Sequence, residues 1–71
     1  PIFLKVPKNT DVHFVNLDKE WHDIKVFRGG EDFLHSGLIP DGEDFTYSFA
    51  TPGEYYFRLD QSDQTGRIAV Y

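Results

Sequence analysis

The chain has 71 residues, a formal net charge of −5, and neither cysteine nor methionine. A chain of this length builds one thin hydrophobic core, so we expect a single domain over residues 1–71. The lack of sulfur excludes disulfides, thiolate catalysis and iron–sulfur clusters. The negative charge and the seven scattered basic residues argue against a nucleic-acid partner. No apolar run approaches the roughly 20 residues of a transmembrane helix.

Turn-forming residues divide the chain at 7–11, 28–30, 40–42 and 51–53, where Pro, Gly, Asn and Asp gather. Between these turns, apolar side chains recur at every second position, which predicts β-strands and not helices. We expect six strands, at 2–6, 12–16, 21–27, 45–50, 55–60 and 68–70. Short strands separated by regular turns are typical of an antiparallel β-sandwich or barrel.

The same alternation predicts which side chains face the core. The expected inward residues are Ile2, Leu4, Val6, Val12, Phe14, Asn16, His22, Ile24, Val26, Phe45, Tyr47, Phe49, Tyr55, Phe57, Leu59, Ile68 and Val70. The segment 30–40 mixes acidic and apolar residues without a stable period. We therefore expect it to cross between the two sheets, with room for one irregular strand.

Three histidines supply the imidazole groups of this chain. His13 lies between two inward positions and His35 lies in the irregular segment, so we interpret both as ordinary surface residues. His22 shares an inward face with Ile24 and Val26, at the end of the row. Because neutral imidazole is a common metal ligand, His22 is a candidate metal ligand, and it is equally interpreted as a hydrogen-bonded residue at the rim of the core.

Three segments, in order along the chain, read VPKNTDVHFVNLDKEWHDIKVF, SGLIPDGEDFTYSFATPGEYYF and GRIAV. Together they resemble the cupredoxins, the blue-copper family that includes plastocyanin and pseudoazurin. The resemblance covers nearly the whole chain. It implies an all-β, antiparallel Greek-key sandwich and an extracytoplasmic location, periplasmic or secreted.

The resemblance also implies positions for a copper site, and most of its ligands are missing. His22 falls on the first copper-binding histidine, Asn16 on the asparagine that braces the site, and Leu59 on the cysteine. Tyr55 and Phe57 fall on the aromatic positions of the strand that carries this cysteine. A type 1 copper site needs two imidazoles and a thiolate, so we expect this chain to lack one.

The second histidine and the axial methionine of the family also have no counterpart here. The histidine is expected near Gln61 or Ser62, and the methionine near Gln64 or Thr65. The loop is about one residue shorter than the family spacing implies. Ser62 and Thr65, like Asn16 and Leu59, are therefore interpreted as remnants of a lost site.

A different metal site remains an alternative. His22 with Asp60, Asp63 and an amide or hydroxyl oxygen would form a mixed nitrogen and oxygen set for Zn²⁺, Cu²⁺ or Ni²⁺. Against this, Asp60 has the same parity as the outward Arg58, so we expect it to point away from His22.

Cupredoxins normally carry a strand before the one matched by Ile2–Val6, so the resemblance implies an open sheet edge. Three interpretations stand. The sequence is a piece of a longer protein, the domain is naturally minimal, or a partner supplies the strand by β-augmentation. A second copy of the chain is one such partner.

No enzymatic signature accompanies these features. Ser48 and Ser62 have no His and Asp partners at a recognisable spacing, and no glycine-rich phosphate loop is present. We expect a non-enzymatic domain without a cofactor, which acts through structure or protein contact. Trp21, the polar loop after Leu59 and the open edge would form its surface. The alternative is a copper-binding electron-transfer or metal-handling protein that uses His22.

Overall fold

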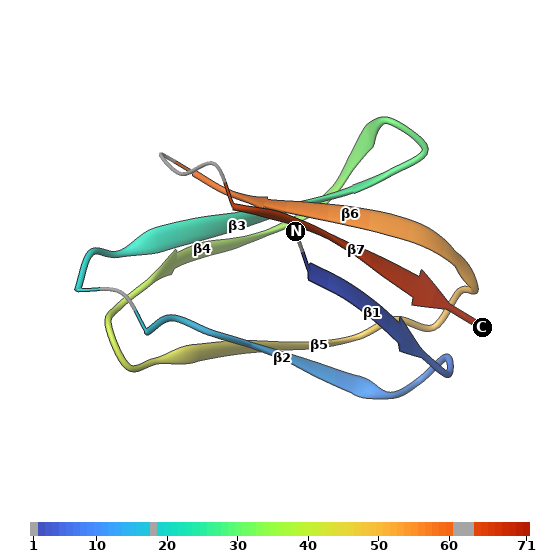
Figure 1. Ribbon diagram of the computed structural model, residues 1–71, viewed down its shortest axis with the longest axis horizontal. Helices are drawn as coiled ribbons and strands as arrows, with labels where there is room; N and C mark the ends of the chain where they lie inside the picture. The colour runs from blue at the N-terminus through green and yellow to red at the C-terminus, as the bar shows by residue number, and fades with distance from the viewer. Residues whose placement is uncertain (1, 18, 61–63) are drawn as a thin grey trace.

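The computed structural model describes residues 2–17, 19–60 and 64–71 and places seven β-strands in two sheets (Figure 1). The strands are β1 (Ile2–Val6), β2 (Asp11–Val15), β3 (His22–Arg28), β4 (Glu31–Ile39), β5 (Asp44–Ser48), β6 (Gly53–Leu59) and β7 (Thr65–Val70). The described residues contain no helix, and hence none that could cross a membrane.

The larger sheet has the order β1-β7-β6-β3-β4, and the smaller sheet contains β2 and β5. The two sheets face each other as a sandwich (Figure 1). Neighbouring strands are antiparallel except β1 and β7, which run parallel. This parallel pair lies within the antiparallel sandwich that the sequence predicts. No hairpin joins these two strands, so the chain does not force them to run in opposite directions.

The predicted inward faces form the core. The buried apolar residues are Val6, Val12, Phe14, Ile24, Val26, Ile39, Phe49, Tyr55, Phe57, Ile68 and Val70. Aromatic rings join the two sheets: Phe14 of β2 meets Phe57 of β6 edge-on, with ring centroids 5.4 Å apart. Asn16 and His22 are the buried polar residues of the described chain.

Residues 31–39 form β4, a nine-residue strand at the edge of the larger sheet. The expected crossing segment is thus a full strand, and its irregularity is a bulge. Asp23 pairs with Leu38, whereas Lys25 pairs with His35, so the register shifts at Ser36 and Gly37. The Ser36 hydroxyl accepts a 2.9 Å hydrogen bond from the Ile24 amide, which replaces the missing ladder bond.

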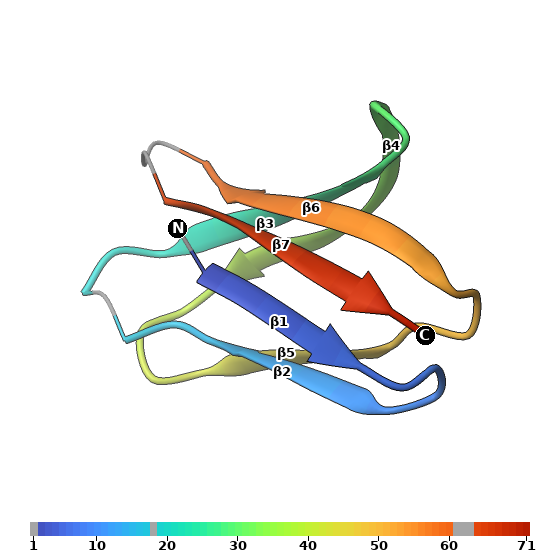
Figure 2. The ribbon, with the colours of Figure 1, turned by 45° about the vertical axis from the view of Figure 1, so that its right-hand side comes forward.

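Strand β1 departs from the expected burial. Ile2 and Leu4 share the inward parity of Val6, yet they are 60% and 38% exposed. The larger sheet has five strands and the smaller one has two, so the smaller sheet leaves part of the inner face uncovered. Figure 2 shows β1 at this uncovered side, next to β7. Alternation alone cannot indicate whether anything lies opposite an inward face.

Candidate functional site

The candidate site lies at one end of the sandwich, where a cavity of about 550 Å³ opens between the sheets. His22 begins β3, Asn16 follows β2, and Leu59 ends β6. All three line the cavity together with Gln64 and Thr65 of the β7 region. The structure therefore brings together the described residues that the resemblance to cupredoxins assigns to one copper site.

His22 is buried and lies against Asp60. Its Nδ1 atom is 3.2 Å from the Asp60 carbonyl oxygen and 3.4 Å from Asp60 Oδ1. Asp60 also receives a 2.9 Å hydrogen bond from the Asp23 amide through Oδ1. The expectation that Asp60 points away from His22 is wrong. β6 ends at Leu59, so Asp60 belongs to a turn and strand parity no longer sets its direction.

Asn16 links the two sheets near His22. Its Nδ2 group donates a 2.7 Å hydrogen bond to the Ile39 carbonyl and a 2.8 Å bond to the Glu20 carbonyl. Ile39 ends β4 in the larger sheet, whereas Asn16 extends β2 in the smaller one. The side chain therefore holds three segments in register at the wall of the cavity.

Leu59 is half-buried and packs against the hydrophobic core. Its register partner on β3 is Ile24, two residues beyond His22. An isobutyl group thus occupies the β6 position closest along the sheet to His22, and it offers no lone pair to a metal. Thr65 begins β7 and is exposed. Gln61, Ser62 and Asp63 lie outside the described residues.

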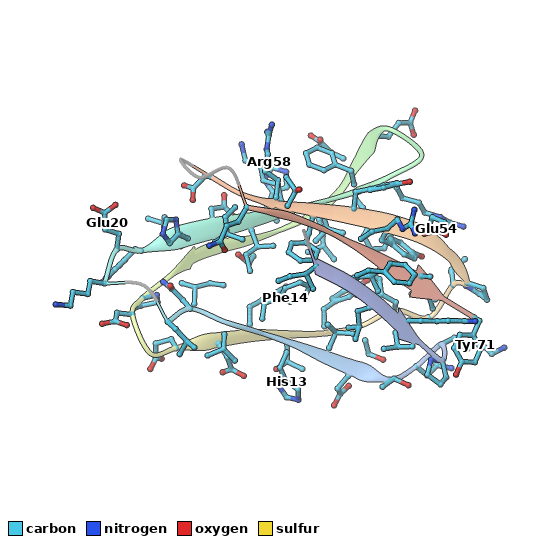
Figure 3. The ribbon with its side chains drawn as sticks, in the orientation of Figure 1. His13, Phe14, Glu20, Glu54, Arg58 and Tyr71 are labelled. Atoms are coloured by element: carbon cyan, nitrogen blue, oxygen red, sulfur yellow. The ribbon has the colours of Figure 1, made fainter. Side chains whose placement is uncertain are left out.

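Trp21 and the other two histidines lie at the surface, as expected for His13 and His35. Trp21 precedes β3 and is 59% exposed, so its ring does not close the cavity. His13 projects from the outer face of β2, opposite to the inward Phe14 (Figure 3). Its Nδ1 atom lies 2.8 Å from Thr46 Oγ1 and 3.3 Å from Asp44 Oδ2. His35 is exposed, with Nε2 3.9 Å from Asp32 Oδ2.

The donor set does not fit a type 1 copper ion. Such a site needs a thiolate, and this chain has no cysteine. No group of three or more His, Cys, Asp or Glu side chains gathers at metal-binding distance within residues 2–17, 19–60 and 64–71. At the cavity, His22 Nδ1 lies 3.4 Å from Asp60 Oδ1, and this carboxylate oxygen already accepts the Asp23 amide.

Sequence reasoning missed the apolar rim of the cavity. Ile2, Leu4, Val15 and Leu17 line it, and each is at least 38% exposed. The signal in the sequence that could have indicated this rim was the presence of large aliphatic side chains in and after the strands. The exposure of Ile2 and Leu4 follows from the unequal size of the two sheets, which only the structure reveals, whereas Val15 faces outward from β2 and Leu17 lies in the loop after it.

No protein-family model matches the chain, and no curated protein matches it. Solved structures do resemble it. A purple cupredoxin from Nitrosopumilus maritimus superposes with a TM-score of 0.86, covering 100% of this chain and 79% of its own, at 24% identity. A reduced and an oxidised amicyanin variant each superpose with a TM-score of 0.83, covering 97% of this chain and 69% of theirs, at 19% identity. The chain therefore adopts the cupredoxin fold.

Proposed function

We propose that this chain is a non-enzymatic cupredoxin-like domain without a type 1 copper site, and that it acts through protein contact. One observation carries the proposal: Leu59, the residue that the resemblance matches to the copper-ligating cysteine, lines the same cavity as His22. The chain contains no sulfur atom that could replace this cysteine. Burying a leucine there adds apolar area to a small core and does not present a ligand.

The surface around the cavity supports a contact role. Large apolar side chains on and beside β1 and β2 remain in contact with solvent, although monomeric proteins rarely expose large contiguous apolar patches. Strand addition at an open sheet edge is a common mode of peptide recognition. Trp21 belongs to the same end of the molecule and extends the exposed surface. An extracytoplasmic location, periplasmic or secreted, follows the likeness to cupredoxins.

Metal handling through His22 is the second candidate, because Asp60 Oδ1 lies 3.4 Å from His22 Nδ1. Asp63, the third proposed ligand, lies outside the described residues. A single imidazole with carboxylates would take Zn²⁺ or Cu²⁺ without producing a blue-copper centre.

Copper titration tests the proposal directly. We expect added Cu²⁺ to produce no intense visible charge-transfer band and no saturable heat of binding in calorimetry. Trp21 is the one tryptophan and adjoins His22, so its fluorescence reports a copper ion bound there. His22→Ala removes the candidate imidazole, and His35→Ala is the matched control, an exposed histidine on β4.

The two candidates give different results in this experiment. Equal titration curves for the parent chain, His22→Ala and His35→Ala support the proposed function. Saturable quenching of Trp21 that His22→Ala abolishes and His35→Ala preserves would establish metal handling. An intense visible band in the parent chain would overturn the proposal outright.

A further inference from the structure

Basic residues of this acidic chain gather on the outer face of the larger sheet. The described strands of this face carry four of the seven basic residues and only three of the twelve acidic ones. Its three middle strands, β7, β6 and β3, each have a neighbour on both sides, so the face does not depend on an edge of the sheet. Figure 3 shows Arg58 projecting from it, on the side opposite to His13. The basic residues are Lys5, Lys25, Arg58 and Arg67, and the acidic ones are Asp23, Asp32 and Glu54.

A hollow of about 560 Å³ lies on this outer face. Two arginines line it, and no carboxylate of the described residues does. The hollow is therefore positively charged and aromatic, on a chain whose net charge is −5. Its outward-facing lining residues are Phe3, Phe27, Tyr56, Arg58, Thr65 and Arg67.

Tyr56 is the neighbour of both arginines in the sheet. Arg67 is its register partner on β7, and Arg58 lies two residues along β6 on the same face. Phe27 is its register partner on β3. Because Tyr56 is about half exposed, its ring offers apolar surface to a partner next to two positive charges.

Aromatic rings hold the two guanidinium groups. Arg67 Cζ lies over the ring of Phe3, 4.5 Å from its centroid, and Arg58 Cζ lies over the ring of Phe27 at 5.7 Å. A guanidinium group that stacks on a ring keeps N–H donors free for a carboxylate. Stacking therefore orients both arginines without neutralising their charge.

Two of the three acidic residues on this face have contacts with β4. Asp23 Oδ1 accepts the Gly37 amide at 3.2 Å, and Asp32 Oδ2 lies 3.9 Å from His35 Nε2. Neither residue lines the hollow. Their carboxylates therefore leave the arginines beside Tyr56 without a counter-charge.

The third acidic residue offsets one arginine in part. Glu54 Oε2 lies 3.6 Å from Arg67 Nε. Arg58 and Lys25 are register partners, and neither forms an ion pair with an acid of the described residues. Like charges directly opposite each other on neighbouring strands are destabilising, so carboxylates from outside the chain would stabilise this pair.

We propose that the outer face of the larger sheet, at the hollow beside Tyr56, binds an acidic segment of a partner protein. Carboxylates of the segment pair with Arg58, Arg67 and Lys25, and an apolar side chain between them packs on Tyr56. Exposed Tyr, Phe and Arg side chains are typical of the centres of protein interfaces. A second copy fits less well, because two chains of net charge −5 repel each other. This inference rests on the protein-contact role proposed above and adds the surface and the charge of the partner.

Peptide binding tests the inference. The probe is a labelled nine-residue peptide with a central phenylalanine and four glutamates on each side, and its match has glutamine in place of glutamate. The chain as a whole repels the acidic peptide, so its binding reports a local positive surface. We expect the glutamine peptide to bind at least about tenfold more weakly. Exchange of the central phenylalanine for serine should weaken binding by about fivefold.

Two arginine variants locate the bound carboxylates. Arg58→Gln and Arg67→Gln should each lower the affinity for the acidic peptide by about two- to fivefold, in line with one exposed ion pair. Lys8→Gln is the matched control, because Lys8 is an exposed residue of the turn after β1 and its loss changes the net charge equally. This variant should bind like the parent chain.

Removal of an acid from the face should have the opposite effect. Glu54→Gln frees Arg67 from its ion pair, so the acidic peptide should bind about twofold more tightly. Glu43→Gln removes the same charge at an exposed residue before β5, and it should change the affinity less.

Two tyrosine variants test the apolar contact. Tyr56→Ala should weaken binding of the acidic peptide by at least about fivefold. Tyr71→Ala removes a similarly exposed ring, after β7, and should leave binding intact. Circular dichroism of all the variants separates loss of the site from loss of the fold.

Each other outcome overturns the inference in a distinct way. Equal binding of the glutamate and glutamine peptides, or no binding up to about 1 mM, removes the acidic partner. Equal losses in Arg58→Gln and Lys8→Gln would reduce the effect to net charge and remove the face. Self-association that Arg58→Gln abolishes would make a second copy the occupant. None of these results depends on copper, whereas the proposed function fails in the copper titration.

Discussion

Asn16 reaches from the smaller sheet to the larger one and donates a 2.7 Å hydrogen bond from Nδ2 to the carbonyl oxygen of Ile39. The same group also bonds the Glu20 carbonyl, so the side chain ties the loop before β3 to both sheets. Asn16 is buried. Removing one partner of a buried hydrogen bond leaves the other partner unsatisfied, and this lowers stability by more than the hydrogen bond itself contributes.

Asn16→Ala should lower the free energy of unfolding by about 1–3 kcal/mol, because the Ile39 carbonyl loses its hydrogen bond from the Asn16 side chain in a buried site. Urea denaturation monitored by Trp21 fluorescence measures the change. Leu17→Ala is the control: Leu17 is the next residue and is 86% exposed, so its change should remain within about 0.5 kcal/mol. Equal effects of the two substitutions would contradict a bracing role for Asn16.

The strands that were predicted well are those with one face on the core. Their alternation is regular because every second residue is buried, as in β6, where Tyr55 and Phe57 alternate with exposed neighbours. β4 was not predicted as a full strand, since a bulge at Ser36 and Gly37 interrupts its register and most of its residues face solvent. Parallel pairing of β1 with β7 depends on contacts between distant segments, which local patterns do not contain.

The sequence predicted part of the lining of the cavity but not its geometry. The resemblance placed Asn16, His22 and Leu59 together, and they do line one cavity. Asp60 was misassigned because alternation holds only inside a strand, and this residue lies in the turn after β6. The apolar rim of the cavity at Ile2 and Leu4 was also missed, since the burial of these side chains depends on what the other sheet covers.

The bulge between β3 and β4 gives a second prediction. Ser36→Ala removes the hydroxyl that accepts the Ile24 amide at 2.9 Å, and Ile24 is a buried residue. We expect a loss of about 1–2 kcal/mol in unfolding free energy and faster hydrogen exchange at the Ile24 amide. Ser48→Ala, at an exposed serine of β5, serves as the control. An unchanged exchange rate at Ile24 would show that the bulge does not need Ser36.

Close approach of β6 and β7 gives a third prediction. A Cβ atom at Gly66 would collide with the ring of Phe57, its register partner on β6. Gly66→Ala should therefore cost about 1–3 kcal/mol by overpacking. Phe57→Leu removes the ring, so the double variant should be more stable than the sum of the two single losses implies. Strictly additive losses would mean that the strain arises elsewhere.

The last prediction concerns Tyr55, whose side chain is fully buried. Its hydroxyl donates a 2.7 Å hydrogen bond to the Thr51 carbonyl, which fixes the turn before β6. Tyr55→Phe keeps the ring contact with Phe49, whose centroid lies 4.6 Å away, and removes only the hydroxyl. The unfolding free energy should fall by about 1 kcal/mol.

Tyr56→Phe is the matched control for this change, because Tyr56 is the next residue of β6 and is 48% exposed. Its hydroxyl is not buried, so its removal should leave stability within about 0.5 kcal/mol of the parent chain. Thermal and urea unfolding of the two variants make the comparison. A larger loss in Tyr56→Phe than in Tyr55→Phe would show that the outer face of the larger sheet, and not the turn at Thr51, depends on a tyrosine hydroxyl.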